Sequence, residues 1–227
     1  MGVRWMLLTV ATGLALQVAG CQSGPPPKGE EVHADQRLAA LYVWSPYDPD
    51  RHRETCKVWH EIYAPDGRLL TKGLGGEFEH HRGLFFGHNQ VRSSNRSFDF
   101  WHCRSGVSQR HMGFLDPSTI EGLEGNWQVA QIDWCDADGK AIVRELRALT
   151  AIAEGPDRTR IEVAIELHAV DAEVRLGGDP QHSGHQFRAL NAFAKPDAEP
   201  LRYVRPASAA GGANDVWTDC DWIAGVL

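Results

Sequence analysis

Long apolar runs and runs of basic residues are both scarce in this sequence, and each absence excludes a class of function. Beyond residue 20, no apolar run reaches the roughly 20 residues that a membrane-spanning helix needs. The 23 lysines and arginines are outnumbered by 30 aspartates and glutamates, which gives a formal net charge of −7. Because nucleic-acid binding needs concentrated positive charge, an acidic chain without a basic run argues against nucleic acid as a partner.

Several motifs are missing as well. The sequence contains no internal repeat, no glycine-rich phosphate loop and no Gly-x-Ser-x-Gly nucleophile elbow. It has only five cysteines and no Cys-x-x-Cys pair, so a structural zinc site of that type is not expected. Beyond Cys21, four scattered cysteines allow three disulfide pairings, and the sequence selects none of them: Cys56, Cys103, Cys135 and Cys220. Buried free thiols are expected for at least two of these four.

The amino end has the pattern of an export signal. After Arg4, residues 5–18 are uncharged and mostly apolar, and this run is too short for a membrane span. It leads into small residues before Cys21, a pattern that resembles the bacterial lipobox, where a peptidase cuts before a cysteine that then carries lipid. We therefore predict a signal peptide over residues 1–20 and lipidation at Cys21, with an ordinary signal peptide as the alternative.

Residues 21–35 are predicted to be a flexible tether, since Gly24–Pro27 and the polar residues around it lack apolar side chains to bury. Gln22 is not an acidic retention signal, which favours anchoring at the outer membrane or the periplasmic face of the envelope. Residues 36–227 then form one domain that is long enough to bury a large core.

The hydrophobic pattern of this domain predicts strands rather than helices. Leu38–Trp44 and Thr55–Tyr63 are apolar and rich in β-branched or aromatic residues. Pro65–Gly67 has the composition of a tight turn, after which Arg68–Thr71 returns to complete a hairpin.

Three longer segments predict an antiparallel meander: Asn126–Cys135, Ala141–Ile152 and Ile161–Leu167. The last of these alternates strictly between apolar and polar residues, which is the period of a half-buried strand. Ala141–Leu149 contains good helix formers, but its neighbours favour a strand. The fold class is therefore all-β, an antiparallel β-sandwich. The apolar stretch Trp217–Leu227 ends with the chain itself, so we expect the domain to be truncated at its carboxyl end.

Histidines are concentrated in one stretch, from Glu77 to His102. Four of the eleven histidines fall within 23 residues there, beside Arg82 and several aromatic residues. Because histidine titrates near neutral pH and also binds metals, we predict that this stretch forms one wall of a polar pocket. In the first interpretation, its imidazoles transfer protons, Arg82 orients the substrate, and Phe86 and Trp101 stack on a sugar ring.

A metal site is the second interpretation. If residues 80–88 are a strand, His80 and His88 share one face, and the shell is completed by Asp99, or by His182 and His185. This spacing matches no named metal motif, so the metal ligands stay unknown. We therefore predict no cofactor, and a bound divalent metal is the alternative. Hydrogen-bonded structural histidines are the third interpretation, which we favour for the isolated His52, His60, His111 and His168.

Several motifs together resemble those of a family of unknown function, DUF6807, some of whose members carry the label methane oxygenase PmoA. The motifs are His80–Leu84 with Gly87-His88, Asp99–Trp101, and His182–Gly184 with Gln186–Arg188. The resemblance covers roughly residues 40–227. It implies a sandwich akin to the galactose-mutarotase supersandwich and a link to carbohydrate degradation. Relatives in this family usually continue with further strands beyond the point where this sequence ends. A methane oxygenase subunit needs several spanning helices, which this sequence lacks.

The resulting hypothesis is an exported lipoprotein that acts on carbohydrate by epimerisation, elimination or hydrolysis. Its catalytic candidates are His80, His81, Arg82, His88 and His185. Its substrate-binding candidates are Phe86, Asp99, Trp101, His102, His182 and Arg188. The expected partner is a carbohydrate or another small molecule, with membrane contact through the lipid only and no nucleic acid. The alternatives are a non-catalytic glycan-binding lipoprotein and a metal-dependent enzyme that uses the same histidines.

Overall fold

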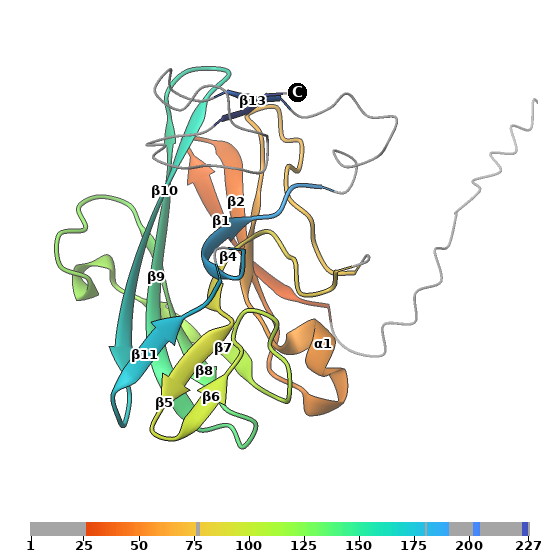
Figure 1. Ribbon diagram of the computed structural model, residues 1–227. Helices are drawn as coiled ribbons and strands as arrows, with labels where there is room; N and C mark the ends of the chain where they lie inside the picture. Colours follow the sequence, from red (N-terminus) through yellow and green to blue (C-terminus); the bar gives the residue numbers. More distant parts are fainter. Residues whose placement is uncertain (1–25, 76–77, 180, 191–201, 205–223, 227) are drawn as a thin grey trace, which may run out of the picture.

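The computed structural model describes residues 26–75, 78–179, 181–190, 202–204 and 224–226. Within them the protein is an antiparallel β-sandwich, as the sequence predicted (Figure 1). The first sheet has the order β1 (Lys28–Ala34), β2 (Arg37–Trp44), β3 (Trp59–Ile62), β4 (Leu84–His88) and β12 (Ser183–Phe187). The second has the order β10 (Thr159–Ala169), β9 (Ala141–Ala153), β8 (Gln128–Cys135) and β7 (Ser108–Leu115).

Smaller elements complete the described fold. A third sheet has the order β11 (Val174–Gly177), β5 (Gln90–Ser93) and β6 (Arg96–Phe98), and β13 (Arg202–Val204) pairs with β14 (Ala224–Val226). The short helices are η1 (Pro49–Arg51), α1 (His52–Thr55) and η2 (Pro117–Thr119). In Figure 1, β9 and β10 run along one side of the molecule and α1 lies on the opposite side. None of the helices described is long and apolar enough to cross a membrane.

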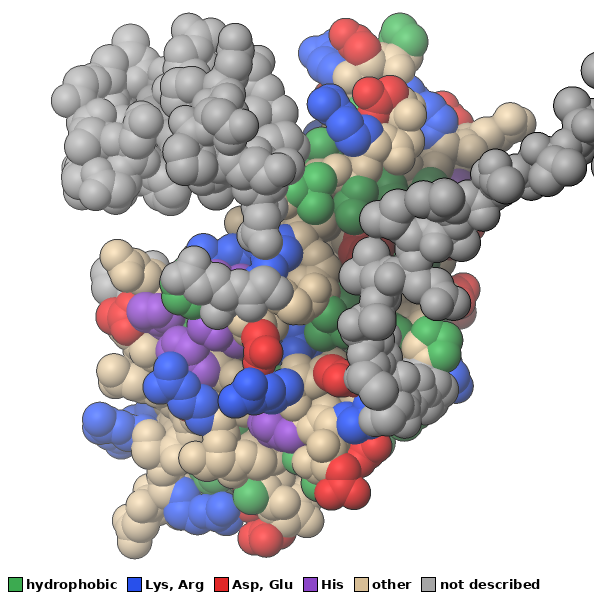
Figure 2. Space-filling view, turned by 90° about the vertical axis from the view of Figure 1, so that its right-hand side faces the viewer, with side chains coloured by type: hydrophobic (Ala, Val, Ile, Leu, Met, Phe, Trp, Pro, Cys, Tyr) green, Lys and Arg blue, Asp and Glu red, His purple; other side chains and the backbone are tan. Residues whose placement is uncertain are grey.

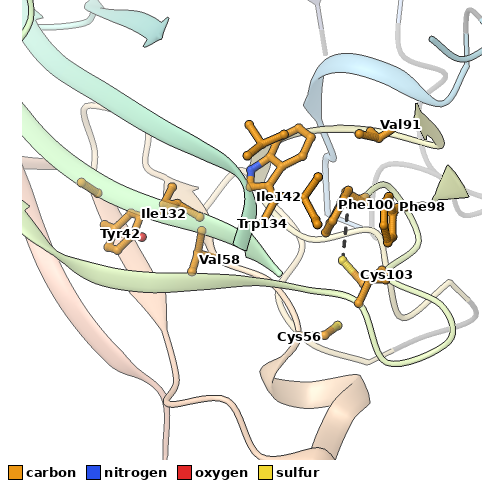
Figure 3. Packing of buried hydrophobic residues seen from close by; sticks show 13 residues of the cluster. Tyr42, Cys56, Val58, Val91, Phe98, Phe100, Cys103, Ile132, Trp134 and Ile142 are labelled. Carbon is orange, nitrogen blue, oxygen red and sulfur yellow. Dashed lines mark hydrogen bonds between the residues drawn. The ribbon is translucent and has the colours of Figure 1, made fainter. Parts of the chain in front are cut away.

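The main core lies between the two large sheets. Tyr42 from β2 packs with Ile132 and Trp134 from β8, and each of these side chains is buried (Figure 3). An Ile side chain of this kind contributes about 1.5–3 kcal/mol when it is removed from water. The core therefore forms because alternate residues of facing strands bury their apolar side chains against each other.

A second apolar layer covers the outer face of the first sheet. Phe85 packs there with Trp59 and Trp101, whereas Phe86 points to the inner face and packs against Trp134. This division follows from the alternation of side chains along β4. The loop that contains Trp101 is thus held against the outer face, which is where the candidate site lies.

Most of the predicted strands are confirmed. The meander of β8, β9 and β10 forms as expected, and Ala141–Ala153 is a strand throughout. The turn after Tyr63 also forms, although its returning segment makes isolated bridges rather than a strand. Thr55 belongs to α1, so the second strand begins later than predicted, at Trp59.

The prediction of a tether up to residue 35 was wrong for its second half. Lys28–Ala34 is the edge strand β1, which pairs with β2 along its length. Only Val32 and Ala34 of this strand are buried, and its other residues are exposed to solvent. The predicted signal peptide, Cys21, Glu77, Cys220 and most of the predicted strand at 217–227 lie outside the described residues.

Candidate functional site

The turn before β4 is fixed to the outer face of the first sheet by Gly83 and Arg82. Gly83 has a φ of +47°, and a Cβ added to it would lie 2.1 Å from the carbonyl oxygen of His60. Only glycine permits this close approach of the turn to β3. Arg82 is buried, and its guanidinium donates to the carbonyls of Glu79 (3.0 Å), Glu54 (3.1 Å) and Arg53.

This geometry corrects the predicted role of Arg82. All of its described hydrogen bonds go to backbone carbonyl oxygens, so the guanidinium joins the turn to α1. A side chain used in this way is not available to clamp a substrate carboxylate. Its burial lowers the pKa of the guanidinium but leaves it a cation.

Two aspartates hold imidazoles at the same spacing in two distant segments. Asp99 accepts a hydrogen bond of 2.7 Å from Nδ1 of His102, and Asp179 accepts one of 2.7 Å from Nδ1 of His182. The same carboxylates accept backbone N–H groups, from Trp101 and His102 at Asp99 and from Gln181 at Asp179. A carboxylate can only accept, so it selects the tautomer with hydrogen on Nδ1 and leaves the Nε2 lone pair free.

Four imidazole rings from three segments form a continuous group, which we call the imidazole cluster. His80 lies 4.2 Å from His81 and 4.6 Å from His102, measured between ring centroids. His102 in turn lies 5.0 Å from His182. The structure thus brings together four of the histidines that the sequence analysis singled out: His80, His81, His102 and His182.

Two of the predicted catalytic histidines lie elsewhere. His88 donates from Nδ1 to the carbonyl of Gly177 (3.0 Å). His185 pairs with Phe86 across β4 and β12, and it lines a separate hollow with residues such as Ile161. Both histidines share the inward side of β4 and β12, because alternate residues of a strand point to the same face and directly paired residues do too.

The two predicted stacking residues are also part of the interior. Trp101 is fully buried beneath Phe85, with ring centroids 4.8 Å apart, and Phe86 packs 5.9 Å from Trp134. The Trp101 ring has no face free for a sugar, so that assignment was wrong, whereas Phe86 is half-buried and its stacking role stays a prediction. The exposed aromatic ring beside the cluster is Phe78, which is 50% exposed and lies 5.2 Å from His81.

Two rings of the imidazole cluster, His80 and His81, are uncharged at neutral pH. Burial, reinforced by neighbouring positive charges, lowers the pKa of His80 to about 3 and that of His81 to about 4. The nearby cations include Lys57 and Arg188. Burial also lowers the pKa of His102, although Asp99 opposes the shift. Groups with a pKa this low are poor proton acceptors, so His80 and His81 are suited to hydrogen bonding rather than to general-base chemistry.

A cleft of about 500 Å³ adjoins the cluster, and His80 and His102 belong to both. Its other lining residues are His52, Arg53, Cys56, Glu79, Arg82, Cys103, Arg104 and Ser105. Figure 2 shows histidine side chains gathered on the side that carries α1, with basic and acidic side chains around them. The cleft is therefore polar and carries charges of both signs.

Other features of the site bear on the remaining predictions. Arg188 is half-buried, its guanidinium carbon lies 6.0 Å from the Trp101 ring centroid, and its role in substrate binding stays a prediction. Among the described residues, no three His, Cys, Asp or Glu side chains lie close enough to hold a metal ion, which does not support the metal alternative. Sequence reasoning missed Phe78 and Asp179. The repeated Asp-x-x-His spacing would have indicated Asp179.

Comparison with known protein families gives a match over most of the chain. The model of a family described as a family of unknown function (DUF6807) matches residues 30–225. No curated protein and no solved structure matches the chain.

Proposed function

The chain belongs to the DUF6807 family of unknown function, and we propose that it is an exported lipoprotein enzyme acting on a carbohydrate or a similar polyhydroxylated molecule. The observation that carries this proposal is the imidazole cluster at the edge of the cleft. Two of its four rings are held by carboxylates.

Neutral imidazoles suit a ligand that is rich in hydroxyl groups. Each offers one donor and one acceptor, which matches the hydrogen-bonding capacity of a sugar hydroxyl. His80 and His81 are neutral at pH 7 because their pKa values are lowered by burial, so they bind without attracting a counter-ion. The exposed ring of Phe78 lies beside them and offers a flat apolar surface to the C–H face of a sugar.

His102 and His182 are the proton-transfer residues of the proposal. Each has its Nδ1–H held by an aspartate at 2.7 Å, which leaves Nε2 to take up or return a proton. Two such rings with centroids 5.0 Å apart suit a reaction in which one ring removes a proton and the other supplies one. This favours epimerisation or elimination over hydrolysis by a carboxylate pair, since Asp99 and Asp179 are already engaged by the imidazoles.

The test uses the full-length chain and a set of plant and algal oligosaccharides. Binding is measured by calorimetry and turnover by mass spectrometry in D₂O, where proton removal from carbon introduces deuterium. We expect His102→Gln to lower turnover by about 100-fold or more while binding is largely kept. The matched control is His168→Gln, since His168 is exposed on β10 and paired with Glu166.

The outcomes separate the alternatives. Binding without turnover in the unaltered protein would make the chain a glycan-binding lipoprotein instead. Absence of binding across the set would contradict the carbohydrate proposal. The export part is tested separately by mass spectrometry of the cell-envelope protein, where lipid is expected on Cys21 and absent from the Cys21→Ser variant.

A further inference from the structure

Two cysteines from different segments line the same cleft. Cys56 directly follows α1, and Cys103 lies in the loop that contains Trp101 and His102. Both are almost fully buried and belong to the main apolar cluster, and both also line the cleft (Figure 3). Neither forms a disulfide in the structure.

Backbone contacts hold both cysteines in place. The carbonyl of Cys56 accepts a hydrogen bond from the N–H of Gln109 at 2.8 Å, and the carbonyl of Cys103 accepts one from Nε2 of His52 at 2.6 Å. The N–H of Cys103 donates to the carbonyl of Asp99 at 3.0 Å. The backbone of each cysteine is therefore held in place by hydrogen bonds to other segments or turns.

Two buried cations lie beside these thiols. Lys57 and Arg82 are each about 1% exposed, and among the described residues no carboxylate lies within salt-bridge distance of either. Their hydrogen bonds go to carbonyl oxygens, including those of Trp101 for Lys57 and Glu54 for Arg82. A buried cation needs an anion or strong dipoles nearby, and a thiolate at Cys56 would supply that anion.

The pKa values of the two thiols are shifted in opposite directions. The pKa of Cys56 is lowered, first by hydrogen bonding with the Cys103 thiol and then by the charges of Arg82 and Lys57, against the effect of burial. The same hydrogen bond and burial raise the pKa of Cys103. Cys56 is thus the nucleophilic sulfur, and Cys103 is its protonated neighbour.

We propose that Cys56 and Cys103 form a redox-active dithiol at the cleft, which a small disulfide oxidant converts into an intramolecular disulfide. The Cys56 thiolate attacks one sulfur of the oxidant, whose S–S bond breaks and releases one thiolate. The Cys103 thiol then loses its proton and attacks Cys56 in the mixed disulfide, releasing the second thiolate. The oxidant gains two electrons and the dithiol loses two.

The disulfide would join the two walls of the cleft. One wall follows α1 and the other carries His102, so the oxidation state would fix their separation. This inference does not depend on what the cleft binds. It depends only on the two thiols and the cations beside them.

The experiment treats the full-length chain with oxidised glutathione at pH 7 and maps the products by peptide mass spectrometry. We expect a Cys56–Cys103 cross-linked peptide, and for Cys103→Ser a glutathione adduct that accumulates on Cys56. Cys135 is the matched control, because it is equally buried but its pKa is raised by burial. Cys56 should react at least about 10-fold faster than Cys135.

Three results would overturn the inference. The first is no modification of Cys56 in protein whose circular dichroism shows it to be folded. The second is a cross-link from Cys56 to a cysteine other than Cys103. The third is reaction of Cys135 as fast as Cys56. Because the unaltered protein gives the main readout, a variant that fails to fold does not leave the inference untested.

Discussion

His102 is held by Asp99 through a hydrogen bond of 2.7 Å between Nδ1 and Oδ2, and the same aspartate also accepts the backbone N–H of His102. The carboxylate therefore orients both the ring and the turn that carries it. The relationship is repeated at Asp179 and His182, where the ring bond has the same length. The duplication provides a matched pair for experiments.

Asp99→Asn should change the tautomer of His102. The amide has a donor as well as an acceptor, so it no longer requires hydrogen on Nδ1. We expect ¹⁵N NMR to show the Nδ1–H tautomer of His102 in the unaltered protein and a mixture of tautomers in the variant. Asp179→Asn should do the same to His182 and leave His102 unchanged. Identical ¹⁵N shifts for His102 in all three proteins would contradict this view of Asp99.

Stability should fall as the pH falls, because of His80 and His81. Their pKa values are lowered to about 3 and about 4 in the folded protein, from an ordinary value of 6.5. The unfolded chain thus binds more protons between these values, so the stabilisation is complete above pH 6.5 and is lost as the pH falls toward 4 and 3.

The measurement is the free energy of unfolding at pH 7 and at pH 5, obtained from urea titrations. His80→Asn and His81→Asn should each reduce the difference between the free energies of unfolding at pH 7 and at pH 5. His168→Asn is the control, because that exposed side chain lies in β10, away from the cluster. Equal pH dependence in all four proteins would show that the cluster does not resist protonation.

Arg82→Met should destabilise the fold by about 3 kcal/mol. The substitution keeps an unbranched apolar stem but removes the guanidinium, which leaves the carbonyl groups of Arg53, Glu54 and Glu79 without their donor. Arg104→Met provides the control, since Arg104 lines the same cleft but is exposed, and it should change stability by less than about 0.5 kcal/mol. Similar urea midpoints for the two variants would mean that Arg82 does not stabilise the turn.

Gly83→Ala should destabilise more than a typical substitution of a glycine with positive φ. The added Cβ would clash with the His60 carbonyl at 2.1 Å, in addition to the cost of about 1 kcal/mol for a left-handed backbone. Gly122→Ala separates the two effects, because Gly122 has a φ of +82° and nothing within 4 Å of the added atom. The unfolding temperature of Gly83→Ala should be clearly lower than that of Gly122→Ala. The reverse order would contradict the close approach of Gly83 to the His60 carbonyl.

Much of the sandwich could be predicted because its strands follow simple patterns. The alternation in Ile161–Leu167 and the turn at 136–139 correctly indicated the meander of β8, β9 and β10. Strand β1 was missed because an edge strand needs few apolar residues, and Lys28–Ala34 buries only two side chains. The predicted likeness to galactose mutarotase stays a prediction, because no solved structure matches.

The site was harder to predict because closeness along the chain does not determine which face a side chain occupies. Phe85 and Phe86 are adjacent in sequence and lie in different apolar layers. The predicted strand over 80–88 begins only at Leu84, so His80 and His81 lie in the turn before β4 and the alternation that would have placed His80 with His88 does not reach them. His182 joins the cluster only through tertiary contacts, which no local pattern reveals.

The antiparallel pairing of β4 with β12 has a consequence for how the site appears during folding. It places Ser183 opposite His88, and so brings a late segment of the chain next to an early one. Closing so long a loop is entropically unfavourable until both sheets are in place. The contact between His102 and His182 should therefore be among the last to form, and a spectroscopic signal from these two rings would report that the whole sandwich has assembled.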